Sequence, residues 1–169
     1  MSAPAAERQF EEFVTAAWPR LRWTAYLLCG DHHLAEDLTQ TALARTYSAW
    51  RRIRRDDPTA YARAVLVNLN IDRMRRRRFL EVSEEQAPES VSEPAAGDLE
   101  RREQVVALLR QLGDRERAVV VLRHYYDLSE AQVAAELGIP RGTVKSTLSR
   151  ALSKMRVTTE SVGSMNGRD

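Results

Sequence analysis

Apolar residues recur at helical spacing along most of the chain. In residues 10–29 they fall at i, i+3 and i+4 positions, which predicts one or two helices, because Pro19 must kink or divide a helix that contains it. Gly30-Asp31 provides a helix stop and a new N-cap, so a second helix is expected over residues 34–50. No region alternates apolar and polar residues over a strand length, so the pattern predicts an all-α fold.

A third helix is expected after a polar loop at residues 51–57. Asp57-Pro58 combines an N-cap carboxylate with a proline at the first helical position, where the missing N–H is harmless. The helical pattern continues past Asp72 into the four consecutive arginines at 75–78. Cations suit the carboxyl end of a helix, but four in succession exceed that need and favour an anionic partner.

A change in composition divides the chain. Residues 81–98 are rich in Pro, Ser and Glu and hold too few large apolar side chains to form a core, which is typical of a flexible linker. The pattern therefore predicts two small helical domains, residues 1–80 and 99–158. A short polar tail at 159–169 is expected to be disordered.

The second domain ends in a pattern typical of a helix-turn-helix. Its first two helices are expected at residues 99–112 and 115–126. Residues 128–155 read LSEAQVAAELGIPRGTVKSTLSRALSKM, in which Ser129 and Gln132 form a capping box. Gly138 follows at the position where a left-handed backbone conformation costs least, and the second helix starts directly after it.

The last helix has one apolar and one polar face. Its outward residues are small, hydroxylic or basic, and they include Arg141, Thr143, Lys145, Ser146, Ser149, Arg150 and Ser153. Such a face fits the major groove of DNA, because Arg can bind two acceptors on guanine while Lys and hydroxyls reach bases or phosphates. A purely structural pair of helices is the alternative.

Charge is strongly segregated along the chain. Residues 45–78 contain eleven Arg and three acids, whereas residues 81–100 contain seven acids and no base. A basic block of this density is what a phosphate backbone attracts. A solvated, Arg-rich face is the alternative that charge alone leaves open.

A narrow polar stripe follows the second helix between two apolar arcs. Its members are short or amide-bearing side chains suited to hydrogen bonding with another protein: Asp37, Gln40, Thr41, Ala44 and Ser48. An ordinary hydrated face explains the same pattern.

Several function classes find no support. Cys29 is the only cysteine, which excludes an internal disulfide, and His33 with Asp37 lacks a third ligand placed by spacing, so no metal or cofactor is expected. Ser129 is better explained as a helix cap than as a nucleophile. The sequence has no signal-peptide core and no run of eighteen apolar residues. We therefore expect a cytoplasmic protein that is not an enzyme.

The order of these parts resembles the extracytoplasmic-function (ECF) group of sigma-70 factors. AEDLTQTALARTYSAW, residues 35–50, is similar to the family's helix that docks on the β′ clamp helices of core RNA polymerase. The resemblance assigns polymerase binding to Asp37, Leu38, Gln40, Thr41 and Ala44.

DPTAYARAVLVNLNIDRMRRRRF, residues 57–79, resembles the family's segment that melts the promoter and reads its minus-ten element. The resemblance assigns contacts with the non-template strand to Arg51, Arg54, Asn68, Asp72, Arg73, Arg76 and Arg77. The loop at residues 51–57 would help to hold a base flipped out of the duplex.

Residues 112–156 resemble the family's carboxy-terminal domain, with GTVKS as the most specific match. This domain reads the minus-thirty-five element and contacts the β flap, which assigns DNA contacts to Arg141, Thr143, Lys145, Ser146, Ser149 and Arg150. WPRLRWTAYLLCGD and VVVLRHYYDLSE are similar to actinobacterial members. The acidic linker would pass through polymerase channels as a mimic of nucleic acid.

The resulting hypothesis is a sigma factor that binds core RNA polymerase and promoter DNA and has no membrane partner. Many members of the family are held inactive by an anti-sigma protein, which makes such a protein a candidate partner. The rival hypothesis is a regulator whose helix-turn-helix binds an operator without polymerase. A basic amino-terminal part without an obvious ligand-binding architecture speaks against the rival.

Overall fold

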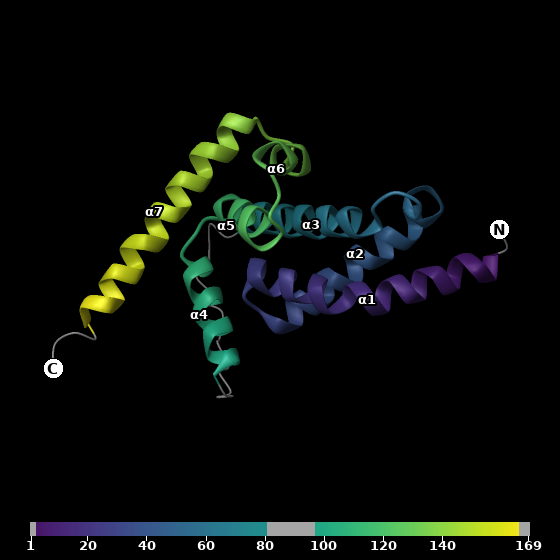
Figure 1. Cartoon of the computed structure of the whole chain (residues 1–169), viewed down its shortest axis with the longest axis horizontal. Helices are drawn as coiled ribbons and strands as arrows, with labels where there is room; N and C mark the ends of the chain where they lie inside the picture. Colours follow the sequence, from purple (N-terminus) through teal and green to yellow (C-terminus); the bar gives the residue numbers. More distant parts are fainter. Residues whose placement is uncertain (1–2, 81–96, 166–169) are drawn as a thin grey trace. The chain divides into compact units, whose positions relative to one another are not determined.

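The computed structural model describes residues 3–80 and 97–165 (Figure 1). Their regular structure is entirely helical, which confirms the all-α fold class. The helices are α1 (Ala3–Cys29), α2 (His32–Ile53), α3 (Pro58–Leu80), α4 (Asp98–Arg110), α5 (Asp114–Val120), a π-helical turn (Val121–Tyr125), α6 (Glu130–Leu137) and α7 (Arg141–Met165). They group into two compact units, Met1–Glu89 and Ser90–Asp169. Most of the expected linker, residues 81–96, lies outside the described residues.

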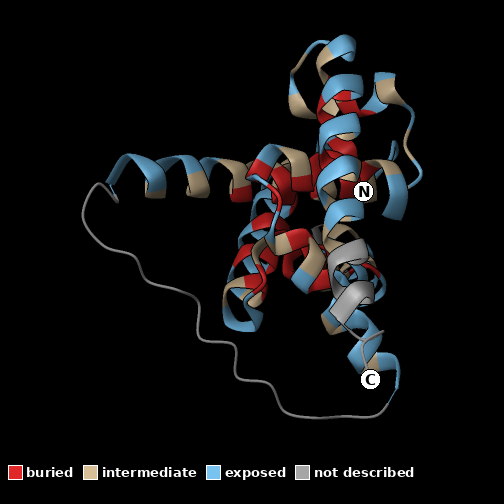
Figure 2. Cartoon of the chain, turned by 90° about the vertical axis from the view of Figure 1, so that its left-hand side faces the viewer, coloured by how far each residue is buried: buried red, intermediate tan, exposed pale blue. Residues whose placement is uncertain are grey.

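The first unit is a bundle in which α1, α2 and α3 contact one another in every pair. Burial is concentrated in this bundle on Leu21, Leu28, Leu66 and Val67, each at most 1% exposed (Figure 2). Buried threonines face the same core, and none of their hydroxyls is left without a hydrogen bond, because each donates to the main-chain carbonyl four residues earlier. Thr39 Oγ1 lies 2.7 Å from the carbonyl oxygen of Ala35, for example.

α1 is a single helix that contains Pro19. The prediction allowed one or two helices here, and the continuous one forms because a proline removes only one hydrogen bond from the ladder. The turns around it are held by burial of Ala17, Leu21 and Ala25 in the core.

The boundaries of α2 and α3 follow the predicted caps. Asp31 accepts a hydrogen bond from the N–H of Leu34 at 2.9 Å, and Asp57 accepts one from Ala60 at 2.9 Å. The expected loop at residues 51–57 is shorter than predicted, since α2 runs to Ile53. Ile53 is 7% exposed, so its burial one turn after Trp50 extends the helix through two arginines.

The second unit is built around α5 and α7. Val119, Leu122, Val133 and Val144 are completely buried and join α5, the π-helical turn, α6 and α7 in one core. Sequence pattern predicted a single α-helix at residues 115–126. The structure divides it into α5 and a π-helical turn, a local change of period that the spacing of apolar residues does not reveal.

The helix-turn-helix forms as predicted. Ser129 Oγ accepts from the N–H of Gln132 at 3.1 Å, and the Gln132 side chain accepts from the N–H of Ser129 at 2.8 Å, which completes the capping box. Gly138 ends α6 with φ 63°, a left-handed conformation that suits glycine.

α7 is longer than expected. It continues to Met165, so residues 159–165 are helical instead of belonging to a disordered tail. No proline interrupts the sequence after Val157, and the backbone ladder therefore continues.

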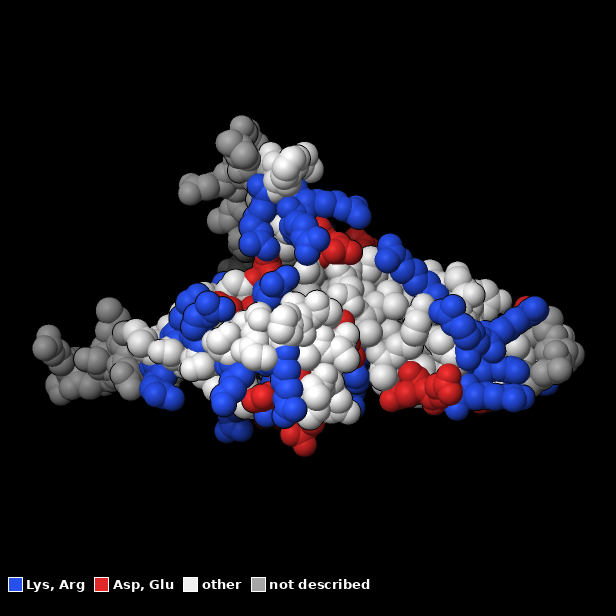
Figure 3. Space-filling view, turned by 90° about the horizontal axis from the view of Figure 1, so that it is seen from above, with Lys and Arg blue, Asp and Glu red and all other residues white. Residues whose placement is uncertain are grey.

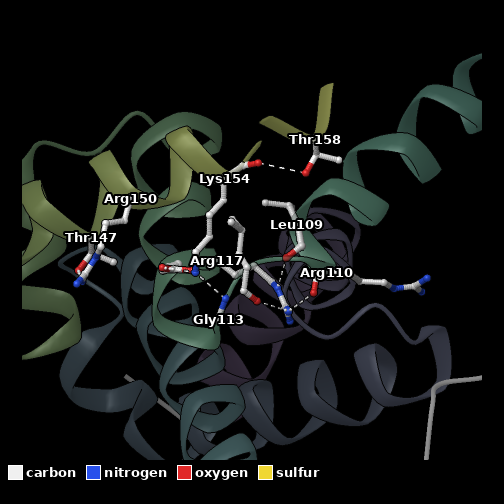
Figure 4. Close-up of polar contacts among 10 residues, drawn as sticks. Leu109, Arg110, Gly113, Arg117, Thr147, Arg150, Lys154 and Thr158 are labelled. Carbon is white, nitrogen blue, oxygen red and sulfur yellow. Dashed lines mark hydrogen bonds and ion pairs between the residues drawn. The ribbon is translucent and has the colours of Figure 1, made fainter. Parts of the chain in front are cut away.

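An arginine closes the carboxyl end of α4. Arg117 is 7% exposed and directs its guanidinium at main-chain carbonyls (Figure 4). Its Nε donates to Leu109 at 2.8 Å, and its Nη2 donates to Leu112 at 3.0 Å and to Arg110 at 3.5 Å. These carbonyls belong to the turn where a helix runs out of its own donors, so the side chain replaces the missing N–H groups.

Candidate functional surfaces

The polar face of α7 is exposed along its first half. Arg141, Lys145, Ser146, Ser149, Arg150 and Ser153 are all exposed, while Thr143 is half-buried in the first turn. Val144 and Ala151 are fully buried on the opposite side. The helix therefore presents donors outward and packs through its apolar side, which is the arrangement that insertion into a major groove requires.

Polar contacts fix α7 on its own unit. Lys154 Nζ lies 2.9 Å from both carboxylate oxygens of Glu116, which is on α5. One turn later, Thr158 Oγ1 donates to Gln111 Oε1 at 2.5 Å. Arg141 pairs with Glu130 at 3.8 Å, which links the start of α7 to α6. These contacts orient the helix that carries the outward residues.

Glu116 has a lowered pKa. Burial alone would raise it, but hydrogen bonds from Lys154 and from the N–H of Gly113, together with the charges of Lys154 and Arg150, lower the pKa of the carboxyl below 4.5. A carboxyl with a depressed pKa in the folded state stabilises the protein above its ordinary pKa, and this stabilisation is lost as pH falls through the depressed value.

Glu116→Gln is expected to lower the free energy of unfolding at pH 7 by about 0.5 to 1 kcal/mol. The difference from wild type should shrink as pH falls through the lowered pKa of Glu116, because the wild-type carboxyl is then neutral too. Chemical denaturation at several pH values measures both effects. Glu100→Gln is the control, since that carboxylate is exposed on α4. A difference that stayed constant down to pH 2 would contradict the assignment.

The polar stripe of α2 is exposed as a whole. Asp37, Gln40, Thr41, Ala44 and Ser48 all face solvent in their unit. Thr41 and Ser48 donate to carbonyls four residues earlier, at 2.9 and 3.2 Å. Leu38, which the resemblance grouped with them, is 7% exposed and packs into the bundle, so it supports this surface from below without forming part of it.

The residues expected to contact the minus-ten element lie on α2, in the turn after it and on α3, and they differ in how far they are buried. Arg51, Asp72 and Arg76 are exposed, whereas Arg54, Arg73 and Arg77 are half-buried. Asn68, also half-buried, donates from Nδ2 to the carbonyl of Ala64 at 2.8 Å. On the face drawn in Figure 3, Lys and Arg side chains clearly outnumber Asp and Glu.

The end of α2, the turn that follows it and α1 together line a hollow of about 430 Å³. It is lined by Gln9, Glu12, Phe13, Trp50, Arg54 and Arg55. Of these, Arg54 and Arg55 belong to the loop at residues 51–57 that was expected at a functional surface, whereas the residues of α1 were not expected there. The contribution of α1 could not be read from the sequence, because some 40 residues separate it from the arginines and no motif joins them.

Metal sites and membrane spans are both absent from the described residues. No three His, Cys, Asp or Glu side chains within residues 3–80 and 97–165 lie where they could share a metal ion. None of the helices in these ranges is both long and apolar enough to cross a membrane.

Comparison with known proteins assigns both units to one family. Residues 13–79 match the family model for sigma-70 region 2, and residues 102–155 match that for sigma-70 region 4. The RNA polymerase sigma-E factor of Streptomyces coelicolor is 42% identical over 149 residues, which cover 88% of this chain and 84% of that protein. The ECF RNA polymerase sigma factor SigL of Mycobacterium tuberculosis is 37% identical over 153 residues, 82% of each chain. The chain belongs to the ECF sigma-70 family.

Two solved structures share the fold of this sigma factor. The sigma factor RpoE from Bartonella quintana, solved with the anti-sigma factor NepR, is 25% identical and gives a TM-score of 0.71 over 89% of this chain and 96% of its own. CnrH, solved with the cytosolic domain of CnrY, is 21% identical and gives a TM-score of 0.64 over 94% of each chain.

Proposed function

We propose that this sigma factor binds core RNA polymerase and directs it to promoters with two spaced elements. The observation that carries the proposal is the presence in one chain of both sigma-70 regions, each with an exposed polar surface. The reaction chemistry belongs to the polymerase, and the sigma factor contributes binding energy for promoter choice and strand opening.

In this proposal α7 reads the minus-thirty-five element and α3 contacts the opened minus-ten element. The exposed donors of α7 suit base edges in a major groove. The arginines at the end of α3 suit the phosphates of a displaced strand. The region 2 match disfavours the rival operator-binding regulator, because an operator-binding protein has no need of it.

Run-off transcription tests the proposal. Core RNA polymerase is mixed with a genomic promoter library, with and without the purified chain, and the transcripts are sequenced. New start sites that share two spaced upstream motifs are the expected result. Duplex sites protected by the chain alone, with no dependent transcripts, would favour the operator-binding regulator instead.

The exposed stripe of α2 is the proposed polymerase contact. Asp37→Arg is expected to weaken binding to core polymerase about tenfold or more. The substitution replaces an exposed carboxylate, which accepts hydrogen bonds, with a cation that can only donate them, and so reverses the charge at the proposed contact. Competition with labelled wild-type chain for core polymerase measures the affinity. Glu11→Arg makes the same charge change at an exposed position on α1 and serves as control. Equal affinities for both variants would exclude the stripe as the contact.

An anti-sigma protein is a further proposed partner. The sigma factor RpoE of Bartonella quintana was solved in complex with the anti-sigma factor NepR, and the fold that it shares with this chain supports the proposal. The same surfaces would then be blocked from binding polymerase.

A further inference from the structure

A lysine on α7 pairs with a carboxylate that is almost buried. Lys154 Nζ lies 2.9 Å from both carboxylate oxygens of Glu116 on α5, and only 13% of the Glu116 side chain is exposed. The N–H of Gly113 donates to the same carboxylate at 3.0 Å. Because a carboxylate with so little access to water is costly without a cation, Glu116 requires a partner of positive charge.

Arg150 is a second cation that acts on this carboxylate. It lies four residues before Lys154, so the two share one face of α7 with about 5 to 6 Å between their Cβ atoms. Burial raises the pKa of the Glu116 carboxyl, and the charge of Arg150, like that of Lys154, lowers it. In Figure 4 the Lys154 side chain extends toward Gly113, whereas Arg150 extends toward Thr147.

The contact that Arg150 makes with Thr147 is weak. Nη2 of Arg150 lies 3.5 Å from Oγ1 of Thr147, at the upper limit of a hydrogen bond, and Arg150 is exposed. A guanidinium held this loosely can turn to DNA or to a nearby carboxylate, which would accept two parallel hydrogen bonds from it. Glu116 would therefore compete with DNA for Arg150 if no other cation occupied it.

We infer that Lys154 is a positioning residue for DNA recognition, which occupies both oxygens of Glu116 and thereby keeps Arg150 available to DNA. The inference rests on the proposed function, because it takes α7 as the helix that reads the minus-thirty-five element. It gives the ion pair between α5 and α7 a role beyond fixing the helix. Without Lys154, the carboxylate would draw Arg150 back onto the surface of the second unit.

Binding of the holoenzyme to a promoter duplex tests the inference, with a duplex that gives dependent transcripts in the run-off experiment. Lys154→Met is expected to weaken binding about threefold or more, because part of the Arg150 contact is lost. Adding Glu116→Gln should restore wild-type affinity, since a neutral amide does not attract Arg150, and Lys154→Arg should bind as wild type does. Arg156→Met, which removes a neighbouring exposed cation of α7, is the matched control and should change affinity less than about twofold.

A double-mutant cycle distinguishes this role from two others. If Lys154 acts only through Arg150, Lys154→Met should have no further effect on DNA binding in an Arg150→Ala background. A lysine that bound phosphate itself, or that only held α7 in place, would weaken binding equally in both backgrounds, and this result would overturn the inference. A failure of Glu116→Gln to restore the affinity of Lys154→Met would overturn it as well.

An NMR measurement without DNA separates the inference from the proposed function. The Nε–H signal of Arg150 in the labelled full chain is identified by its loss in Arg150→Lys. Its exchange with water should slow about threefold or more in Lys154→Met and return to the wild-type rate when Glu116→Gln is added. Slower exchange with unchanged promoter binding would support the capture of Arg150 and refute the proposed reading of DNA through it. Unchanged exchange would refute the capture, whatever the run-off experiment shows.

Discussion

Replacing Arg117 with methionine is expected to lower the free energy of unfolding of the second unit by about 3 kcal/mol. The side chain is 7% exposed and donates to the carbonyls of Leu109, Arg110 and Leu112. Methionine fills much of the same volume but donates nothing. The carbonyls of Arg110 and Leu112 would then lose this donor, while that of Leu109 keeps the N–H of Leu112, and each unsatisfied buried carbonyl costs about 1 to 3 kcal/mol.

Hydrogen–deuterium exchange across residues 98–158 measures this effect locally. All three tryptophans lie in the first unit, so their fluorescence would report the wrong domain. Arg115→Met is the matched control, because Arg115 is exposed on the same helix. Arg117→Lys should recover only part of the stability, since an ammonium lacks the planar fork that reaches several carbonyls at once. Equal protection in Arg117→Met and Arg115→Met would show that the guanidinium contributes little.

Arg117 also marks what sequence pattern could not predict. A single arginine in a charged stretch is ordinarily a surface residue, and only the fold places its guanidinium under the end of α4. The same holds for Glu116 and Lys154, which pair across 38 residues, and for the hollow that α1 forms with α2. These features depend on how distant segments pack, about which local periodicity carries no information.

The helix caps and turns were predicted correctly, because they depend on residues that are neighbours in the sequence. The Asp31 and Asp57 caps, the capping box of Ser129 and the left-handed Gly138 each depend on a few neighbouring residues, and all formed where expected. The outward face of α7 was also correct, because one helix with a fixed period determines which side chains oppose its buried stripe.

Errors arose where burial overrode local signals. α2 passes two arginines of an apparent loop because Ile53 anchors it. The exposure of Phe79 was not predicted either, since an aromatic residue after a basic run is equally compatible with a buried position. It became evident only when the end of α3 proved to lie outside the core.

The double substitution Lys145→Ala with Arg150→Ala is expected to weaken promoter binding more than any other change to this chain proposed above. Removing one base-specific interaction should cost about 1 to 3 kcal/mol, so the pair should cost about 2 to 6 kcal/mol if the two side chains act independently. Both residues are exposed on the face of α7 that opposes Val144 and Ala151. Removing a residue that binds only phosphate would instead weaken binding to all DNA sequences alike and reduce the salt dependence of that binding.

Holoenzyme binding to a promoter and to the same promoter with a changed minus-thirty-five element distinguishes these roles. Arg156→Ala is the matched control, because it removes an exposed charge from α7 beyond the proposed groove contact. Arg150 also helps to lower the pKa of Glu116, so unfolding must be measured beside binding to separate an effect on DNA recognition from an effect on stability. If the stable double variant kept wild-type promoter selection, α7 could not be reading base edges through these two side chains, and the minus-thirty-five contact would have to lie on another face of the second unit.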